Sequence, residues 1–322
     1  MNRTTKRDLV MILATVAAPA VASEQSSWPE GPVRILTPSP PGGSVDLVAR
    51  LLANGLCRRY GQDWIVENRP GADGVVAAQA FVLSRPGSTL LFSAAGIYMA
   101  APLMFAPLPY DTATELVPIA APVTDFVGFF VRSDTPATSL GDFLSRAKAM
   151  PRQFTWATAP GAYLMLNAFF RANGIDIIYV GYRALTAMLP DVAMGRLDMA
   201  YLPLAPSLSM VRDGRLRLLA VSNAERAAAM PDVPTARELG FPTLELESFP
   251  GLFGWKGMPM VLRDEIAAYM RDIIAEPAVT ERLLAIGLVP RPSTRARFEA
   301  DLRHVGALYA EAARRYGARP SD

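Results

Sequence analysis

A turn rich in glycine and proline at residues 38–46 constrains this chain more than any other stretch of its sequence. The apolar run 33–36 precedes the turn, and a run of aliphatic and β-branched residues that ends at prolines is typical of a strand. From Val45 to Tyr60, apolar residues recur at the spacing of one helix face. A strand, a turn and a helix in succession direct free backbone N–H groups and the positive end of a helix dipole at one point. The sequence therefore predicts an anion-binding turn.

The same residues also have a purely structural interpretation. Gly42 and Gly43 suit any tight connection between a strand and a helix, and Gly43 or Ser44 can cap the helix. Asp46 lies in the first helical turn, where a negative charge interacts favourably with the dipole. The sequence leaves open whether Asp46 accepts a hydrogen bond from a ligand or only caps its helix.

Strands and helices alternate after this turn. Strands are predicted at 62–68 and 89–93, with a helix from Val75 to about Ser84 between them. This alternation is typical of a doubly wound α/β sheet, whose ligands bind at the carboxyl ends of the strands.

The second half of the chain repeats the plan. A strand is predicted at 154–158, a turn at 159–163 and a helix at 164–172. One anion-type turn in each half is the arrangement that a ligand cleft between two domains would use. We therefore expect two lobes, lobe 1 from residues 23–125 and 248–322 and lobe 2 from residues 126–247.

The first 22 residues predict export. A basic start, an apolar run at 9–18 and the triplet Ala20-Val21-Ala22 have the pattern of a secretory signal peptide that is cleaved after Ala22. The apolar run is too short to span a bilayer. Cleavage removes three basic residues and one acidic residue, so the formal net charge of +2 falls to about zero and gives no indication of nucleic-acid binding.

Residues with the chemistry of catalysis or metal binding are scarce. The chain has one histidine, His304, and one cysteine, Cys57, both within predicted helices. They cannot form a Ser/His/Asp arrangement or a zinc site, and no acidic spacing matches a calcium loop. The sequence predicts no enzyme, no catalytic residue, no metal site and no cofactor. An exported hydrolase that uses His304 is the alternative from another class.

Six segments of the chain together indicate a family. They are residues 40–46, 66–74, 108–111, 180–183, 195–198 and 231–240. With these segments in this order behind a signal peptide, the chain resembles the solute-binding proteins of tripartite tricarboxylate transporters, also called Bug receptors. The resemblance covers essentially the whole mature length.

The resemblance implies an α/β fold of two lobes, similar to type II periplasmic binding proteins, in which each lobe is a doubly wound sheet flanked by helices. It also implies a periplasmic monomer that closes on a small carboxylate and delivers it to membrane transporter subunits. An orphan receptor that signals to a sensor partner is the alternative.

Carried over from the family, the ligand would be held mostly by backbone amides from both lobes. Lobe 1 would contribute Ser39, Pro41, Gly42, Gly43, Ser44 and Asp46, with Ser93 and Ala94 beside them. Lobe 2 would contribute Thr158, Ala159, Gly161 and Ala162.

The second turn departs from the family pattern. It contains Pro160, which has no amide donor, and it lacks the histidine that usually follows the turn in the family. We therefore expect a ligand with one carboxylate and an apolar or aromatic remainder against Tyr163, Tyr182 and Tyr201. Ordinary packing in the core or at the rim of the cleft is the other interpretation of these tyrosines.

Overall fold

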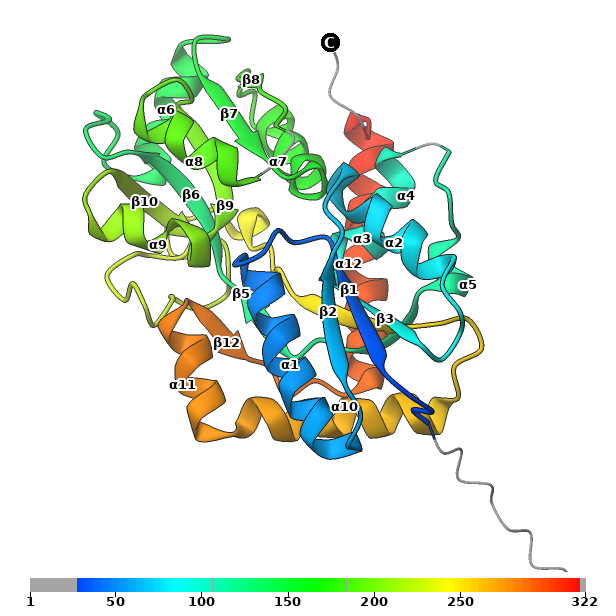
Figure 1. The fold of residues 1–322 in the computed structure, drawn as a ribbon. Coiled ribbons are helices and arrows are strands. Elements are labelled where there is room, and N and C mark those ends of the chain that lie inside the picture. Colours follow the sequence, from blue (N-terminus) through cyan, green and yellow to red (C-terminus); the bar gives the residue numbers. More distant parts are fainter. Residues whose placement is uncertain (1–27, 106, 183–184, 319–322) are drawn as a thin grey trace, which may run out of the picture.

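The computed structural model describes residues 28–318 apart from 106, 183 and 184. The predicted signal peptide and Arg183 of the fourth motif lie outside the described residues. Two five-stranded sheets form the body of the molecule (Figure 1). The first has the order β2-β1-β3-β11-β4, with β1 Val33–Thr37, β2 Trp64–Asn68, β3 Thr89–Ala94, β4 Val117–Ala120 and β11 Pro250–Gly254.

The second sheet has the order β10-β6-β9-β7-β8. Its strands are β6 Val127–Arg132, β7 Thr155–Thr158, β8 Ile178–Tyr179, β9 Met199–Pro203 and β10 Leu216–Val221. Strand β6 runs antiparallel to both of its neighbours, whereas β7 is parallel to β8 and β9. The strands of the second sheet all fall within the range expected for lobe 2, and those of the first all fall outside it. The residue boundaries of the lobes stay a prediction.

Each sheet is covered by helices on both faces, because successive strand residues point to opposite sides. In β1, Ile35 packs with α1 (Ser44–Tyr60) and α10 (Met260–Ala275), and Leu36 packs on the other face with α2 (Val75–Val82). In β6, Phe129 faces α6 (Leu140–Ala149) and α7 (Pro160–Ala172). Its neighbour Phe130 faces α8 (Leu185–Ala193) and α9 (Leu204–Arg212). The predicted doubly wound architecture is therefore present in both lobes.

The chain crosses between the sheets at two adjacent segments. Strand β5 (Val123–Asp125) leads into lobe 2, and the N–H of Asp125 donates to the carbonyl of Ser248, on the segment that leads back, at 2.8 Å. Strand β5 also pairs with β12 (Leu288–Pro290). These neighbouring crossings are the parts of the chain about which the lobes could rotate.

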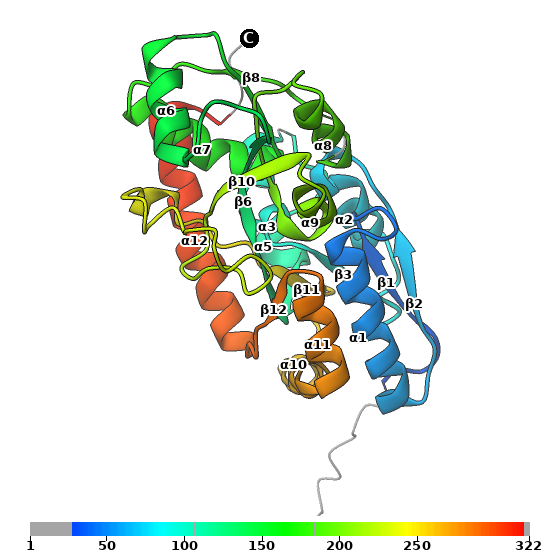
Figure 2. The same ribbon diagram turned by 90° about the vertical axis from the view of Figure 1, so that its left-hand side faces the viewer.

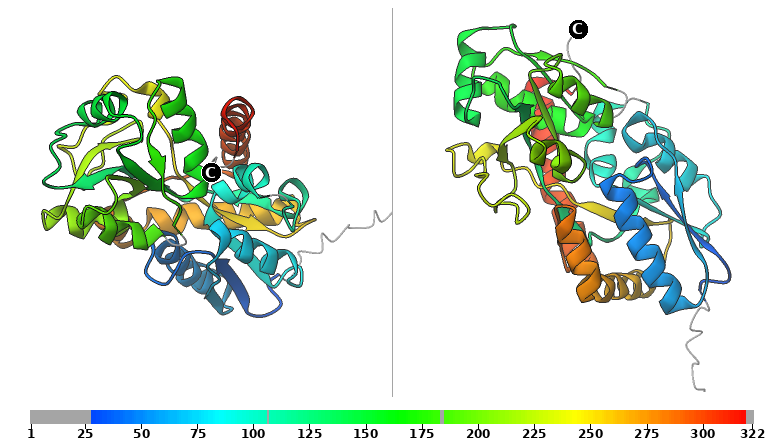
Figure 3. Two further views of the ribbon diagram at one scale, coloured as in Figure 1. Left: turned by 90° about the horizontal axis from the view of Figure 1, so that it is seen from above. Right: turned by 60° about the vertical axis from the view of Figure 1, so that its left-hand side comes forward.

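Helix α12 (Arg295–Tyr316) runs along both lobes (Figure 2). Near its start, Phe298 and Leu302 belong to the core of lobe 1, and farther along Tyr309 and Ala313 pack against the core of lobe 2. A helix of 22 residues is about 33 Å long, which is enough to reach both. Seen from above, α12 and α7 lie side by side (Figure 3).

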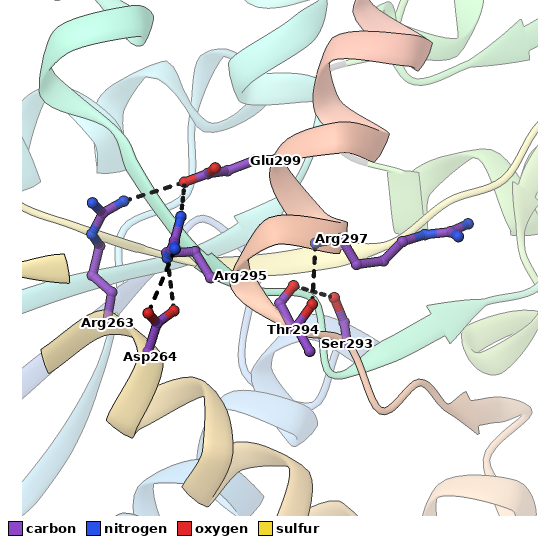
Figure 4. A network of polar contacts seen from close by, with 7 residues as sticks. All are labelled: Arg263, Asp264, Ser293, Thr294, Arg295, Arg297 and Glu299. Atoms are coloured by element: carbon purple, nitrogen blue, oxygen red, sulfur yellow. Dashed lines mark hydrogen bonds and ion pairs between the residues drawn. The ribbon is translucent and has the colours of Figure 1, made fainter. Parts of the chain in front are cut away.

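Side chains fix the start of α12 against α10 (Figure 4). The hydroxyl of Thr294 caps the helix by accepting from the N–H of Arg297 at 3.2 Å. The Arg295 guanidinium donates to Asp264 of α10 at 2.7 Å and to Glu299 at 3.0 Å. The end of α12 in lobe 1 is thus anchored by charge pairs as well as by its apolar face.

Several details differ from the sequence-based expectations. Helix α7 begins at Pro160 rather than at Leu164, because proline suits the first helical position, whose N–H has no partner within the helix. The stretch 102–118 overlaps two short helices that the sequence analysis does not predict. Strand β8 has only two residues. The elements that the sequence analysis does not predict are α3 Gly96–Met99, α4 Ala101–Met104, α5 Thr112–Glu115, α9, α11 Pro277–Ala285 and the 3₁₀ turns Ala72–Gly74 and Pro242–Leu244.

None of the helices in the described part of the chain combines the length and the apolarity that crossing a membrane requires. The one cysteine and the one histidine both lie within helices, as predicted. Cys57 is half-buried and packs on the core of lobe 1, and His304 is exposed on α12.

Candidate functional site

The first turn is built by its glycines. Gly42 has a φ of +82°, a conformation that glycine adopts without strain, and Gly43 is the N-cap of α1. The N–H of Gly43 donates back to the carbonyl of Pro40 at 3.1 Å, and no side chain caps the helix. Pro41 and Gly42 are exposed, while Ser39, Gly43 and Ser44 are half-buried.

Asp46 holds this turn together. The side chain is 1% exposed, and its two oxygens accept from the N–H of Gly42 at 2.9 Å, from Asn68 at 2.7 Å and from Arg50 at 3.0 Å. Burial alone would raise the pKa of Asp46, but these hydrogen bonds outweigh it and the pKa lies below its usual range. Both oxygens are occupied by donors from the protein, which favours the structural interpretation of Asp46 over a contact with ligand.

Asn68, which the sequence analysis did not single out, joins the first turn to the next. Its side-chain amide donates to Asp46 and also to the carbonyl of Ser39 at 2.8 Å. Asn68 ends β2 and leads into the turn 69–74, so the turns that follow β1 and β2 form one surface. Its place before a glycine-rich turn was a signal that could have identified it.

The other residues expected in lobe 1 lie at the ends of neighbouring elements. Ser93 is buried within β3, where it pairs with Gly251, and Ala94 is exposed at the carboxyl end of the same strand. The hydroxyl of Ser44 donates to Asp125 at 3.2 Å. The start of α1 is thereby linked to the crossing between the lobes.

Asp125 is a buried carboxyl group with one oxygen, Oδ1, that has no hydrogen-bond partner among the described residues. Burial raises the pKa of Asp125 to about 7, opposed only by the hydrogen bond from Ser44. Its own N–H and carbonyl bind Ser248 and Asn223, so it also fixes the two crossings to each other.

The second turn is simpler. Ala159 is the N-cap of α7, no side chain caps the helix, and Thr158 is buried with its hydroxyl donating to the carbonyl of Tyr201 at 2.8 Å. Pro160 occupies the first helical position, so Gly161 and Ala162 supply the first N–H groups within the helix.

The two lobes meet at this turn. Asp73, in the 3₁₀ turn before α2 of lobe 1, accepts a long hydrogen bond of 3.4 Å from the N–H of Gly161. The Asp73 side chain stays accessible to solvent. The protein that surrounds it in both lobes raises the pKa of its carboxyl group to about 6 by partial burial. The structure thus places the turns of lobe 1 opposite the start of α7.

The model of the tripartite tricarboxylate transporter family receptor, TctC, matches residues 48–299 of this chain. The chain belongs to this receptor family.

Relatives and solved structures agree with that assignment. A UPF0065 protein of Bordetella bronchiseptica is 30% identical over 299 residues, which covers 92% of this chain and 89% of that protein. The structure "R. palustris Rpa4515 with adipate" is 27% identical with a TM-score of 0.82 and 90% and 98% coverage. MatC of Rhodopseudomonas palustris, with bound malate, is 25% identical with a TM-score of 0.74 and 90% and 99% coverage.

Membership of the TctC receptor family confirms the predicted family and the predicted fold class, a two-lobed α/β periplasmic binding protein. Receptors of this family are periplasmic solute-binding proteins, and the family is not an enzyme family. Within the described residues no cluster of three or more histidine, cysteine or acidic side chains could hold a metal ion.

The three tyrosines expected beside the ligand of this receptor are occupied by other contacts. Tyr163 and Tyr201 are 3% and 4% exposed in the core of lobe 2, where Tyr163 stacks on Trp156 and the Tyr201 hydroxyl contacts Ser222 at 2.5 Å. The half-buried Tyr182 donates to Asp191 at 2.6 Å. In this conformation the rings of Tyr163 and Tyr201 offer almost no surface to a ligand.

A hollow on the surface of the receptor lies elsewhere. Gly55, Arg58 and Tyr269 line it between α1 and α10. Gly55 is eleven residues beyond Ser44, which places it about 16 Å along α1 from the first turn. The hollow therefore takes no part in the site between the lobes.

Proposed function

We propose that this protein is a periplasmic receptor that captures a small carboxylate by closure of its two lobes and delivers it to a tripartite tricarboxylate-type membrane transporter. It acts as a monomer, after cleavage of a signal peptide behind Ala22, and performs no chemistry on the ligand. Nucleic acid, metal ions and cofactors have no part in this function.

One observation carries the proposal: Asp73 of lobe 1 contacts Gly161 at the start of α7 in lobe 2. The turns that follow β1 and β2 are joined through Asn68, so this contact brings the glycine-rich surface of lobe 1 and the helix start of lobe 2 to the same place. Backbone N–H groups of such turns bind carboxylates without a formal charge pair. The adipate and malate that two related structures contain are small carboxylates of this kind.

The residues proposed to contact ligand are those at the edges of the turns. In lobe 1 they are Ser39, Pro41, Gly42, Gly43, Ser44 and Ala94, with Ser93 and Asp46 supporting them. In lobe 2 they are Ala159, Gly161 and Ala162, with Thr158 supporting them. A ligand that touches both sets favours the closed arrangement, because only closure forms all the contacts at once.

A thermal-shift screen of residues 23–322 tests the proposal. The panel holds mono-, di- and tricarboxylates, including aromatic acids, with amines of matched size as controls. A ligand that binds only the folded state adds about 2.7 kcal/mol of stability at a hundred times its Kd. Stabilisation by one class of carboxylate, together with loss of uptake of that acid in cells that lack the receptor, is the expected result. No stabilisation by any carboxylate would contradict the proposal, whereas stabilisation without an effect on uptake would favour an orphan sensor.

A further inference from the structure

The strongest unexplained group in the molecule is the carboxylate of Asp73. It lies in a turn where Gly71, Ala72, Asp73 and Gly74 all have positive φ values, which only glycine adopts readily. This backbone directs the Asp73 side chain out of lobe 1 and toward Gly161 of lobe 2.

Asp73 stands where the helix start of lobe 2 would otherwise receive an anion. Its oxygen is 3.4 Å from the N–H of Gly161, and a methyl group at Gly161 would lie only 3.9 Å from the same oxygen. Since Pro160 has no N–H, Gly161 is the first helical residue of α7 with a donor, and that donor already faces a carboxylate of the protein itself.

No cation balances this charge within the described part of the chain, where neither lysine nor arginine forms an ion pair with Asp73. Three tyrosines lie close enough to Asp73 for its charge to affect their pKa values. Burial raises the pKa values of Tyr110, Tyr179 and Tyr309, and the charge of Asp73 raises them further. The hydroxyl of Tyr110 is buried without a hydrogen-bond partner among the described residues.

The Asp73 carboxylate is exposed to solvent and also faces the start of α7, so its charge is available to a ligand bound between the lobes. With one long hydrogen bond from Gly161, this carboxylate keeps free lone pairs that can accept from a hydrogen-bond donor or a positively charged group of a ligand. A second carboxylate in the same place would meet like charge at short range.

We propose that Asp73 is a specificity-determining residue that selects a ligand with a single carboxylate, held by lobe 1, and an amino or other cationic group directed at lobe 2. This inference rests on the proposed function. It distinguishes the chain from the two related structures, whose ligands adipate and malate carry two carboxylates.

Isothermal titration of the mature chain with matched acids tests the inference. Each set, of three to eight carbons, contains a monocarboxylate, the ω-amino acid and the dicarboxylate of the same length. We expect the ω-amino acid to bind at least tenfold more tightly than the dicarboxylate. We expect Asp73→Asn to reduce that ratio at least tenfold, because asparagine keeps the size and tolerates the same backbone conformation but removes the charge.

Asp63→Asn is the control, since Asp63 is an exposed aspartate before the opposite end of β2. It should leave the ratio unchanged. A wild-type protein that binds dicarboxylates as tightly as amino acids, or a ratio that Asp73→Asn leaves within twofold, would overturn the inference while the receptor function stands. Binding of no acid from any set, in any variant, would overturn both.

Discussion

The two helix starts of the site, one in each lobe, are built in opposite ways. At the start of α1, Asp46 is buried and joins Gly42, Arg50 and Asn68, so the turn is fixed from within its own lobe. At the start of α7 no side chain caps the helix, and the contact of Gly161 is with Asp73 of the other lobe. The first turn is therefore set before any ligand arrives, while the second depends on how the lobes are placed.

Asp46→Ala should lower the free energy of unfolding more than the other substitutions described below. A small loss would contradict the view that the start of α1 is fixed from within its own lobe. The substitution leaves Asn68 and the N–H of Gly42 without their acceptor, so we expect the free energy of unfolding to fall by about 2–4 kcal/mol. Urea denaturation measures it. The matched control is Asp142→Ala in lobe 2, because Asp142 also pairs with an arginine four residues on and accepts from a backbone N–H, but its side chain is 32% exposed. Equal losses for the two variants would mean that the first turn is not held by Asp46.

Asp125→Asn should have a smaller effect that depends on pH. The raised pKa of about 7 means that the folded protein favours the neutral carboxyl group, so its contribution to stability is full below about pH 4 and is lost as the pH rises toward 7. Between pH 5 and pH 8 the wild type should therefore lose about 2–3 kcal/mol of stability relative to Asp125→Asn. Urea denaturation across this range measures the difference, with Asp63→Asn as the control. A difference that does not change with pH would show that Asp125 is ionised throughout.

Alanine at the two turn glycines should give the smallest effects and the sharpest contrast. A methyl group at Gly43 would lie 2.3 Å from the Ser39 hydroxyl oxygen and 3.2 Å from the Pro40 carbonyl oxygen, so we expect Gly43→Ala to cost about 1 kcal/mol. The same change at Gly161 meets nothing closer than 3.5 Å, and alanine favours a helix, so stability should stay equal or rise by up to about 0.5 kcal/mol. Thermal unfolding of the two variants and the wild type measures both changes in stability. A larger loss at Gly161 would contradict the view that the second turn is loosely held.

The order of the elements could be predicted from local pattern. The strand, turn and helix around residues 33–60 are present within one or two residues of the prediction, since a glycine-rich turn between apolar runs leaves few alternatives. At the start of α6, the hydroxyl of Ser139 accepts from the N–H of Asp142, and a serine at a helix start is likewise a local signal. The predicted start of α7 at Leu164 is wrong, because Pro160 was assigned to the turn and is in fact the first residue of the helix.

The roles of individual side chains were predicted less well. The sequence leaves two interpretations of Tyr163 and Tyr201 open, ligand contact and ordinary packing, and in the structure both belong to the core of lobe 2. Burial depends on which helices cover the sheet, and a window of neighbouring residues does not contain that information. Asn68 and Asp125 were not singled out for the same reason, since their partners lie 22 and 81 residues away along the chain.

By itself the sequence determined the family, the two-lobed α/β class and the positions of the glycine-rich turns, because these depend on local spacing and on the order of motifs. Only the tertiary structure decided that Asp46 faces its own lobe, that Asp125 joins the first turn to the crossings, and that Asp73 reaches Gly161. Such contacts join residues from separate strand–helix units, so they exist only when the sheets are assembled and the two lobes are brought together.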